Sequence, residues 1–330
     1  MKPFRYANPA TIDTAVELLA DDGAMAMAGG VDLVHEMKRG IRAPALVVSL
    51  SGIDGLSGIV ERDGVVEIGA LTPVERLLSD PVIATHTPLL TQAAREVATP
   101  QLRAMGTVAG NILQRPQCWY YRDPDSFCLR KGGTHCHAVA GDNRYHAILG
   151  GGPCHIVCPS DLAPALVALD ATVTVQGAGA AERCLPIREL FVGPRTDPHS
   201  EHVLARGEII TRLIVPSSAG AQSLFMKARE RAAWDFALAS ASVLVTRDAN
   251  ATVTRARIVL GGVAPNAWDA SDAAASLVGS PLDAASIARA ADLCVRGARP
   301  LRDNAYKVDL TRRLTARALE TIATHDPIGH

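Results

Sequence analysis

The sequence predicts an α+β protein of two or three domains. Short apolar runs typical of strands are interspersed with amphipathic stretches typical of short helices, and alanine-rich helical segments close the chain. With 330 residues, the chain is long for a single hydrophobic core. Residues 217–221 (SSAGA) have the composition of a linker, so we place a domain boundary there.

The N-terminal part is expected to contain a helix followed by a strand–turn–helix unit. Residues 11–20 are amphipathic, with Thr11 or Asp13 as the N-cap. An apolar run at 24–27 is closed by a glycine pair, and residues 32–38 have a helical pattern. The elements expected next are strands at 45–50 and 65–68 and helices at 73–78 and 89–97.

Between residues 114 and 152 neither a helical nor a strand period persists. A loop of this length inside a compact domain is normally functional or disordered, and its cysteines and aromatic residues argue against disorder. The elements expected after it are a helix at 162–169, a strand at 171–176, a turn-rich segment at 177–207, a strand at 208–215, a helix at 236–241, strands near 243–246 and 256–260, and helices to the end.

Composition and charge exclude several classes of protein. The net charge of −1 gives no reason to expect binding to nucleic acid or to an anionic membrane. No apolar run approaches the roughly eighteen residues of a transmembrane helix, so we expect no membrane insertion. Seven cysteines, an odd number, fit a disulfide framework poorly, and the first residues lack the plan of a signal peptide. We therefore expect a cytoplasmic protein, while export to the periplasm with a signal-bearing partner stays compatible with the sequence.

Residues 28–33 (AGGVDL) form a candidate anion-binding loop. Gly29 and Gly30 allow positive φ angles and let backbone N–H groups converge on a pyrophosphate at the start of a helix. Glycine pairs also occur in ordinary tight turns, so both interpretations stay open. The segment is not a G-x-G-x-x-G fingerprint, which disfavours a Rossmann domain.

Three more polar groups are candidates for nucleotide contact. Residues 107–111 (TVAGN) supply a hydroxyl and a side-chain amide, which suit a phosphate or a flavin edge as well as an Asn-capped turn. Asp161 follows Ser160 at an expected helix start, so it is either an N-cap or an acceptor for a ribose or ribityl hydroxyl. Lys227 by itself has the character of a solvated charge.

A window of cysteines carries the most specific chemistry. No C-x-x-C pair occurs, which weakens zinc-ribbon and thioredoxin-like interpretations. Four thiolates from an irregular loop can ligate an iron–sulfur cube, although unconnected buried thiols remain the alternative. Five of the seven cysteines lie in this window, namely Cys118, Cys128, Cys136, Cys154 and Cys158. One of the last two is surplus to a cluster with four ligands.

Histidines and cations share the window. The histidines are interpreted as surface groups or as N–H···S donors rather than as ligands; they are His135, His137, His146 and His155. The cations either offset the negative charge of a cluster or form a solvated face; they are Arg115, Arg122, Arg130, Lys131 and Arg144.

Together, these segments resemble the FAD-binding (medium) subunit of the molybdenum hydroxylase family, which includes xanthine dehydrogenase, carbon monoxide dehydrogenase and aldehyde oxidoreductases. The resemblance runs through the segments 28–33, 107–111, 159–161 and 227–235 and so covers nearly the whole chain. In most relatives a short connection joins the second and third segments. Here that connection holds the cysteine window, which is similar to the subclass with an extra [4Fe–4S] cluster, and the segments 117–122 and 128–133 look closest to its aldehyde-type members.

The resemblance implies a vanillyl-alcohol-oxidase-type fold. Its FAD-binding subdomains would span residues 1–60 and 61–220, with the cluster loop at 114–158, and a C-terminal α+β domain with a small antiparallel sheet would span 221–330. The residues implied to bind FAD are Ala26, Met27, Ala28, Gly29, Gly30, Val31, Asp32, Leu33, Thr107, Ala109, Gly110, Asn111, Asp161, Ile210 and Lys227. The implied cluster ligands are Cys118, Cys128, Cys136 and Cys154. The chain departs from the family pattern at Ala109, where glycine is usual, and at Val31, where threonine is common.

The resemblance also implies partners and a role. In an aldehyde oxidoreductase or a xanthine dehydrogenase-like enzyme, a large subunit would hold the molybdenum cofactor and oxidise the substrate. A small subunit with two [2Fe–2S] clusters would relay electrons to FAD, which would pass them to an external acceptor. Lys227 would place its ammonium near the pyrimidine carbonyls of the flavin. The rival interpretations are a stand-alone flavin oxidase, a subunit of the 4-hydroxybenzoyl-CoA reductase type, a zinc-stabilised interaction module and a disulfide-rich secreted protein.

Overall fold

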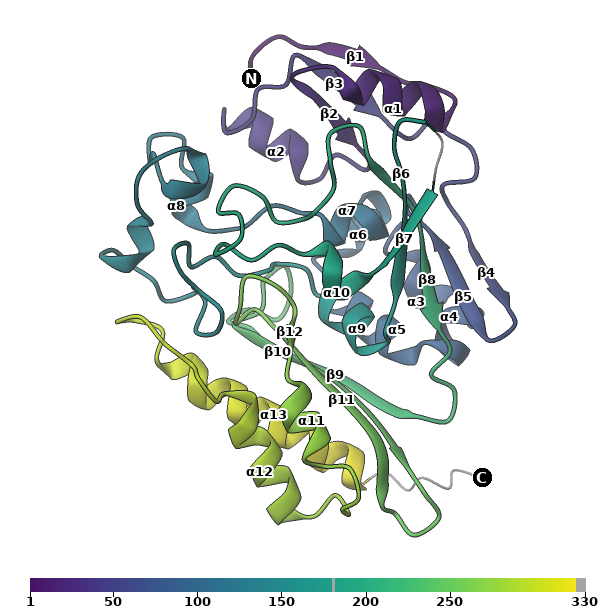
Figure 1. Cartoon of the computed structure of the whole chain (residues 1–330), viewed down its shortest axis with the longest axis vertical. Coiled ribbons are helices and arrows are strands. Elements are labelled where there is room, and N and C mark those ends of the chain that lie inside the picture. Colours follow the sequence, from purple (N-terminus) through teal and green to yellow (C-terminus); the bar gives the residue numbers. More distant parts are fainter. Residues whose placement is uncertain (180–181, 325–330) are drawn as a thin grey trace.

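The computed structural model of the chain describes residues 1–179 and 182–324, so the last six residues of the expected helical tail lie outside the described part. Three separate sheets organise these residues, with strand orders β1-β3-β2, β4-β5-β8-β6-β7 and β12-β11-β10-β9. Figure 1 shows the first sheet at one end, the second in the middle and the third below it, next to the C-terminal helices.

The first sheet is parallel and small. Its strands are β1 (Arg5–Ala7), β2 (Ala24–Met27) and β3 (Leu46–Ser49), and both outer strands pair with β3 in parallel register. The helix α1 (Ile12–Ala20) begins at the Thr11 N-cap, whose side chain accepts from the backbone N–H of Thr14, so Thr11 and not Asp13 is the N-cap. The helix α2 (Leu33–Lys38) follows the glycine loop, so the predicted strand–turn–helix unit is confirmed.

The middle sheet is antiparallel and supports most of the helices. Its strands are β4 (Ile59–Arg62), β5 (Val65–Gly69), β6 (Thr172–Gln176), β7 (Glu182–Pro186) and β8 (Ile209–Pro216). Its helices are α3 (Arg76–Ser79), α4 (Pro81–His86), α5 (Pro88–Arg95), α6 (Pro100–Met105), α7 (Val108–Ile112), α9 (Leu162–Ala168) and α10 (Ile187–Leu190).

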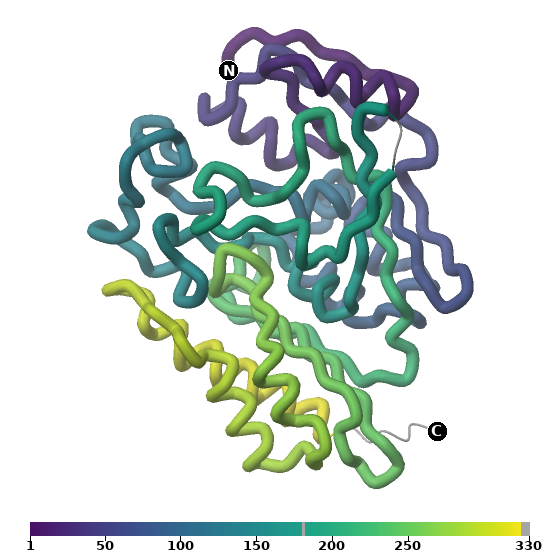
Figure 2. Tube along the Cα trace, in the orientation of Figure 1, coloured from purple at the N-terminus to yellow at the C-terminus, as the bar shows by residue number. Residues whose placement is uncertain are grey.

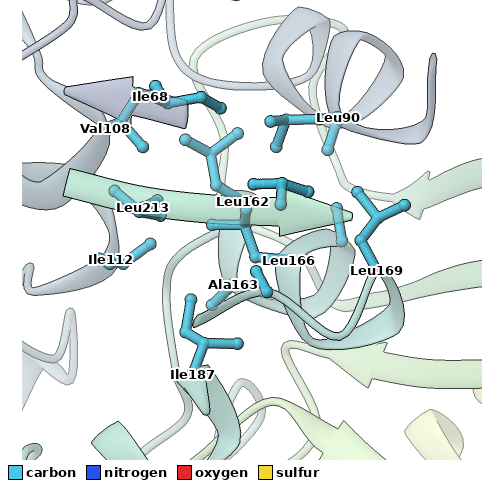
Figure 3. Packing of buried hydrophobic residues seen from close by; sticks show 14 of the residues in the cluster. Ile68, Leu90, Val108, Ile112, Leu162, Ala163, Leu166, Leu169, Ile187 and Leu213 are labelled. Atoms are coloured by element: carbon cyan, nitrogen blue, oxygen red, sulfur yellow. The ribbon is translucent and has the colours of Figure 1, made fainter. Parts of the chain in front are cut away.

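The helix α9 is the centre of the largest hydrophobic core. All seven of its residues are buried, and it contacts α5 and α7 on one side and β10, β11 and β12 on the other. Figure 3 shows Leu162 and Leu166 of α9 among Ile68, Leu90 and Leu213. Because α9 starts at residue 162, this packing fixes the position of the Ser160-Asp161 segment directly before it.

The C-terminal part is an antiparallel sheet covered by helices on one face. Its elements are β9 (Gln222–Ala228), β10 (Ala239–Arg247), β11 (Val253–Gly261), β12 (Trp268–Asp269), α11 (Ser271–Ala275), α12 (Ala284–Cys294) and α13 (Tyr306–Thr324). The helix α13 contacts β9, β10 and α12, while α5 and α9 lie against the same sheet from the other domain. No helix in the described ranges has the length and apolar character needed to cross a bilayer.

The cysteine window forms a lobe of its own, here called the cysteine lobe and defined as residues 114–158. Its regular structure is limited to α8 (Trp119–Arg122) and two short 3-10 turns, Leu129–Lys131 and His137–Val139. The tube in Figure 2 shows the lobe folding back on itself at the side of the molecule, beside α2. The predicted lack of a persistent helical or strand period is therefore confirmed.

Some predicted elements are wrong. Residues 236–241, predicted as helical, contain the start of β10, and the turn-rich segment 177–207 contains β7 and α10. The first seven residues of β10 are all buried because the strand is paired on both sides and covered on both faces. Alanine and serine in such a strand have no period-2 pattern, so its local sequence does not distinguish it from a buried helix.

Candidate functional site

A cleft of about 880 Å³ lies between the first two sheets and their loops. This volume falls in the range of roughly 300–1,000 Å³ that is typical of pockets for cofactors and other small molecules. The walls come from the glycine loop, the α6–α7 region, residues 200–210 and residues 231–236. Fourteen of the fifteen residues predicted to bind FAD line this cleft: Ala26, Met27, Ala28, Gly29, Gly30, Val31, Asp32, Leu33, Thr107, Ala109, Gly110, Asn111, Asp161 and Ile210.

The glycine loop is shaped by a close backbone approach. A Cβ atom on Gly29 would lie 1.7 Å from the carbonyl oxygen of Met105, so no larger residue fits there without movement of the backbone. Gly30 has a φ of +71°, a conformation that L side chains rarely adopt. The two glycines therefore bring the loop against the end of α6, and the loop backbone becomes a wall of the cleft.

A second wall is built from the start of α7. The Thr107 hydroxyl accepts from the backbone N–H of Gly110 at 3.1 Å, so Thr107 rather than Asn111 caps this turn. The Oδ1 atom of Asn111 accepts from the Ser160 hydroxyl at 2.6 Å. Ser160 also accepts from the backbone N–H of Ala163 at 3.0 Å and thereby caps α9. The capping role left open for Asp161 thus belongs to Ser160.

Asp161 uses its carboxylate for a buried ion pair instead. Its Oδ2 lies 2.7 Å from Nζ of Lys227 on β9, and the two side chains are 7% and 1% exposed. Nζ also donates to the carbonyl oxygen of Glu96 at 3.0 Å. Burial raises the pKa of Asp161 to about 6, and the Lys227 charge acts in the opposite direction.

The position of Lys227 differs from a solvated charge. It is buried, and it is the one predicted FAD-binding residue that does not line the cleft. Its ammonium donates to the carboxylate of Asp161, which does line the cleft. No local sequence signal indicates this pair, because Lys227 and Asp161 are brought together by the packing of β9 against the helices of the middle domain.

The cysteine lobe encloses a second, smaller cavity. Its volume is about 10 Å³ on the measure that gives 880 Å³ for the cleft, and it is lined by the four predicted ligands Cys118, Cys128, Cys136 and Cys154. Cys158 does not line it and belongs to the core of the middle domain. All seven cysteines are free thiols, so the lobe is not held together by disulfides.

Polar hydrogens surround the sulfur atoms. Nε2 of His146 lies 3.2 Å from Sγ of Cys118, which fits the N–H···S role expected for a histidine in this window. The backbone N–H groups of Tyr120 and Tyr121 also bond to Cys118, and that of Ile156 bonds to Cys154. Burial raises the pKa of Cys118 to about 12, whereas a hydrogen bond from Cys136 and the charge of Arg130 lower the pKa of Cys154.

The cavity fits an anionic sulfur-rich group better than a single metal ion. In residues 1–179 and 182–324 no group of three or more His, Cys, Asp or Glu side chains is arranged to hold a single metal ion, and the four cysteines instead line one cavity. The cavity is also lined by Arg130 and His137. Nε and Nη2 of Arg130 and Nε2 of His137 are buried and have no hydrogen-bond partner in those ranges. Buried donors of this kind require an acceptor, and an anionic cluster with bridging sulfides supplies one.

A network of charges joins the lobe to the cleft. Asp32 of the glycine loop accepts from Nη2 of Arg122 and from the backbone N–H of Arg115, both at 2.8 Å. Glu36 on α2 accepts from the Tyr121 hydroxyl at 2.6 Å, and both acids line the cleft. The lobe is therefore bonded to the same loop that walls the cleft.

Glu201 is the second junction of this network. It is paired with both Arg115 and Arg130, and Arg122 is paired with Asp32. Three of the five cations in the window are therefore paired and largely buried. Arg144 is exposed and paired with Asp142, while Lys131 donates to the carbonyl oxygen of Asp123. Sequence reasoning missed Glu36, Tyr121 and Glu201, and for Glu201 no signal existed, because it lies in a turn-rich segment far from the window.

Comparisons with known proteins agree with this arrangement. The family described as "FAD binding domain in molybdopterin dehydrogenase" matches residues 2–218, and the family described as "CO dehydrogenase flavoprotein C-terminal domain" matches residues 224–322. The chain is 31% identical over 325 residues to the aldehyde oxidoreductase FAD-binding subunit PaoB of Escherichia coli (strain K12), covering 97% of this chain and 98% of that protein. It is 28% identical over 323 residues to the carbon monoxide dehydrogenase medium chain of Hydrogenophaga pseudoflava, covering 96% of each.

A solved structure gives the same result in three dimensions. A structure of carbon monoxide dehydrogenase from Hydrogenophaga pseudoflava, in a form that lacks the Mo-pyranopterin moiety, superposes with a TM-score of 0.76 and 28% identity. The superposition covers 97% of this chain and 98% of that one. The α+β architecture, an FAD-binding part followed by a C-terminal domain with an antiparallel sheet, is thus that of these flavoproteins. The chain belongs to the FAD-binding medium subunits of the molybdenum hydroxylase family.

Proposed function

We propose that this chain is an electron-transfer subunit that holds FAD in the cleft and a [4Fe–4S] cluster in the cysteine lobe. The observation that carries the second half is the cavity lined by four cysteines and by an arginine with unpartnered donors. The two groups supply one-electron transfer at the cluster and conversion between one- and two-electron steps at the flavin. The residues of this chain supply binding, orientation and charge.

The FAD pyrophosphate is assigned to the glycine loop and the start of α7. Gly29 and Gly30 remove side chains from the loop, and Thr107 and Gly110 form a tight turn beside it. Asp161 accepts from a ribityl or ribose hydroxyl, and Lys227 favours its ionised form from behind. Ile210, buried on β8, supplies an apolar surface for the ring system.

The proposed partners follow from the relatives. The matched proteins are named as an FAD-binding subunit of an aldehyde oxidoreductase and as a medium chain of carbon monoxide dehydrogenase, so each is one component of a larger enzyme. We place this chain in a similar assembly, with a large subunit that holds the molybdenum cofactor and a small subunit with two [2Fe–2S] clusters. An aldehyde oxidoreductase is the favoured class because PaoB matches over nearly the full length of both chains. Affinity purification of the tagged chain from its native host tests this assembly, and recovery without a molybdopterin-containing subunit would contradict it.

Cofactor content provides the test for this chain itself. Anaerobic purification should give roughly four iron atoms, four sulfides and one FAD per chain. Cys136→Ser should lose the iron and the visible cluster absorbance while keeping FAD, because Cys136 lines the cavity but not the cleft. Cys184→Ser is the matched control, since Cys184 is an exposed thiol outside the cavity. Zinc in place of iron, or equal iron in both variants, would refute the cluster assignment.

A further inference from the structure

Arg130 occupies an unusual position in the cysteine lobe. It lies two residues after Cys128 in the 3-10 turn Leu129–Lys131, and its side chain is 1% exposed. It lines the same cavity as the four cysteines, and its positive charge lowers the pKa of the Cys154 thiol. A buried arginine is always charged, so a full positive charge is held at the wall of this cavity.

The donors of Arg130 are used unequally. Nη1 is 2.5 Å from Oε1 of Glu201, which lies on the side of the FAD cleft. Nε and Nη2 are buried and have no oxygen or nitrogen acceptor among residues 1–179 and 182–324. Leaving such charged donors without an acceptor is costly, and the cavity that Arg130 lines is also lined by four cysteines.

The guanidinium is also held in a fixed orientation. Glu201 pairs at the same time with Arg115, whose backbone N–H donates to Asp32 in the glycine loop at 2.8 Å. Arg130 is thus anchored through one edge to the network that borders the cleft, and its free edge is left for the cavity. Such a planar, anchored group suits directed hydrogen bonds to thiolate or sulfide.

We propose that Arg130 is a positioning residue that donates N–H···S hydrogen bonds to the Cys154 thiolate and the adjoining cluster sulfurs, and so sets the reduction potential of the cluster. This inference rests on the proposed function. Reduction adds one electron and therefore one negative charge to the cluster. Both the positive charge and the N–H···S bonds stabilise the reduced form and make the midpoint potential more positive. Glu201 acts in the opposite direction, because its negative charge partly offsets that of Arg130.

The test is a redox titration of the intact chain, followed by electron paramagnetic resonance of the reduced cluster, with iron, sulfide and FAD measured on the same samples. Arg130→Gln should keep the iron and shift the midpoint to a more negative potential, and Arg130→Lys should shift it less in the same direction. Glu201→Gln should shift it to a more positive potential. Arg144→Gln is the matched control, because Arg144 belongs to the same lobe but is exposed and paired with Asp142; its midpoint should equal that of the wild type.

The Arg130 and Glu201 variants should shift the midpoint potential in opposite directions. A loosened lobe would not reverse the direction of the shift with the sign of the removed charge, so these two variants separate a direct electrostatic role from a structural one. An unchanged midpoint in Arg130→Gln with full iron would overturn the inference. If that variant loses its iron, Glu201→Gln decides, and a midpoint equal to or more negative than that of the wild type overturns the inference. A wild-type chain with FAD but no iron would instead overturn the proposed cluster itself.

Discussion

Replacing Lys227 with methionine tests the buried ion pair behind the cleft. The substitution keeps the length and apolar character of the side chain but removes the ammonium that lies 2.7 Å from Asp161 and 3.0 Å from the Glu96 carbonyl oxygen. Asp161 would then lose the charge that opposes the effect of burial on its pKa, so its ionised form would become costly in this site. Both side chains are almost inaccessible to solvent, so water cannot take the place of the ammonium.

The expected cost follows from this burial. Removing one partner of a buried pair typically lowers the free energy of unfolding by about 3–5 kcal/mol, whereas removing one partner of an exposed pair changes it little. Lys227→Met should therefore unfold at a clearly lower urea concentration than the wild type when both are measured without FAD at pH 7. Arg312→Met is the matched control, because Arg312 is 41% exposed and pairs with the exposed Asp309 at 2.8 Å; its unfolding midpoint should stay close to the wild type.

A double variant sharpens the measurement. Adding Asp161→Asn to Lys227→Met removes the unpaired carboxylate, so the double variant should be more stable than Lys227→Met alone. A loss of less than about 1 kcal/mol in Lys227→Met, or no recovery in the double variant, would show that the pair does not stabilise the fold. The same variants should bind FAD more weakly than the wild type, measured by flavin fluorescence, if Asp161 contacts the cofactor.

Two further predictions concern the cleft. Gly29→Ala should destabilise the protein and weaken FAD retention, because its Cβ would lie 1.7 Å from the Met105 carbonyl oxygen. Gly40→Ala is the control: Gly40 has open space around it but a φ of +74°, so this variant should cost only a backbone strain of about 1–2 kcal/mol and should retain FAD after gel filtration. Equal flavin loss in both variants would contradict this. Burial raises the pKa of Asp161 from 3.8 to about 6, so the folded state binds the Asp161 proton more tightly than the unfolded chain does. The contribution of Asp161 to the free energy of unfolding is therefore present at low pH and is lost as the pH rises from about 4 through about 6. Asp161→Asn should lack this decline when urea unfolding is followed across that pH range, and an unchanged decline would assign it to another group.

Local sequence was sufficient where the chemistry depends on residues close together in the chain. The glycine loop, the Thr107 cap and the alternation of β8 each follow from short-range rules of backbone sterics and periodicity. The cysteine lobe was identifiable because its cysteines are crowded and its segment lacks a regular period. The family resemblance added the order of these segments, which no single motif carries.

Tertiary structure decided which side chains meet. It placed Cys154 in the cavity and Cys158 in the core, and it turned Lys227 from an apparent surface charge into the partner of Asp161. It also joined Glu201 to Arg130 across 71 positions of the chain. Sequence alone determined the local turns and the supply of thiols and charges. The pairing of those groups depends on how sheets and helices pack, because burial and direction are properties of the folded core and not of neighbouring residues.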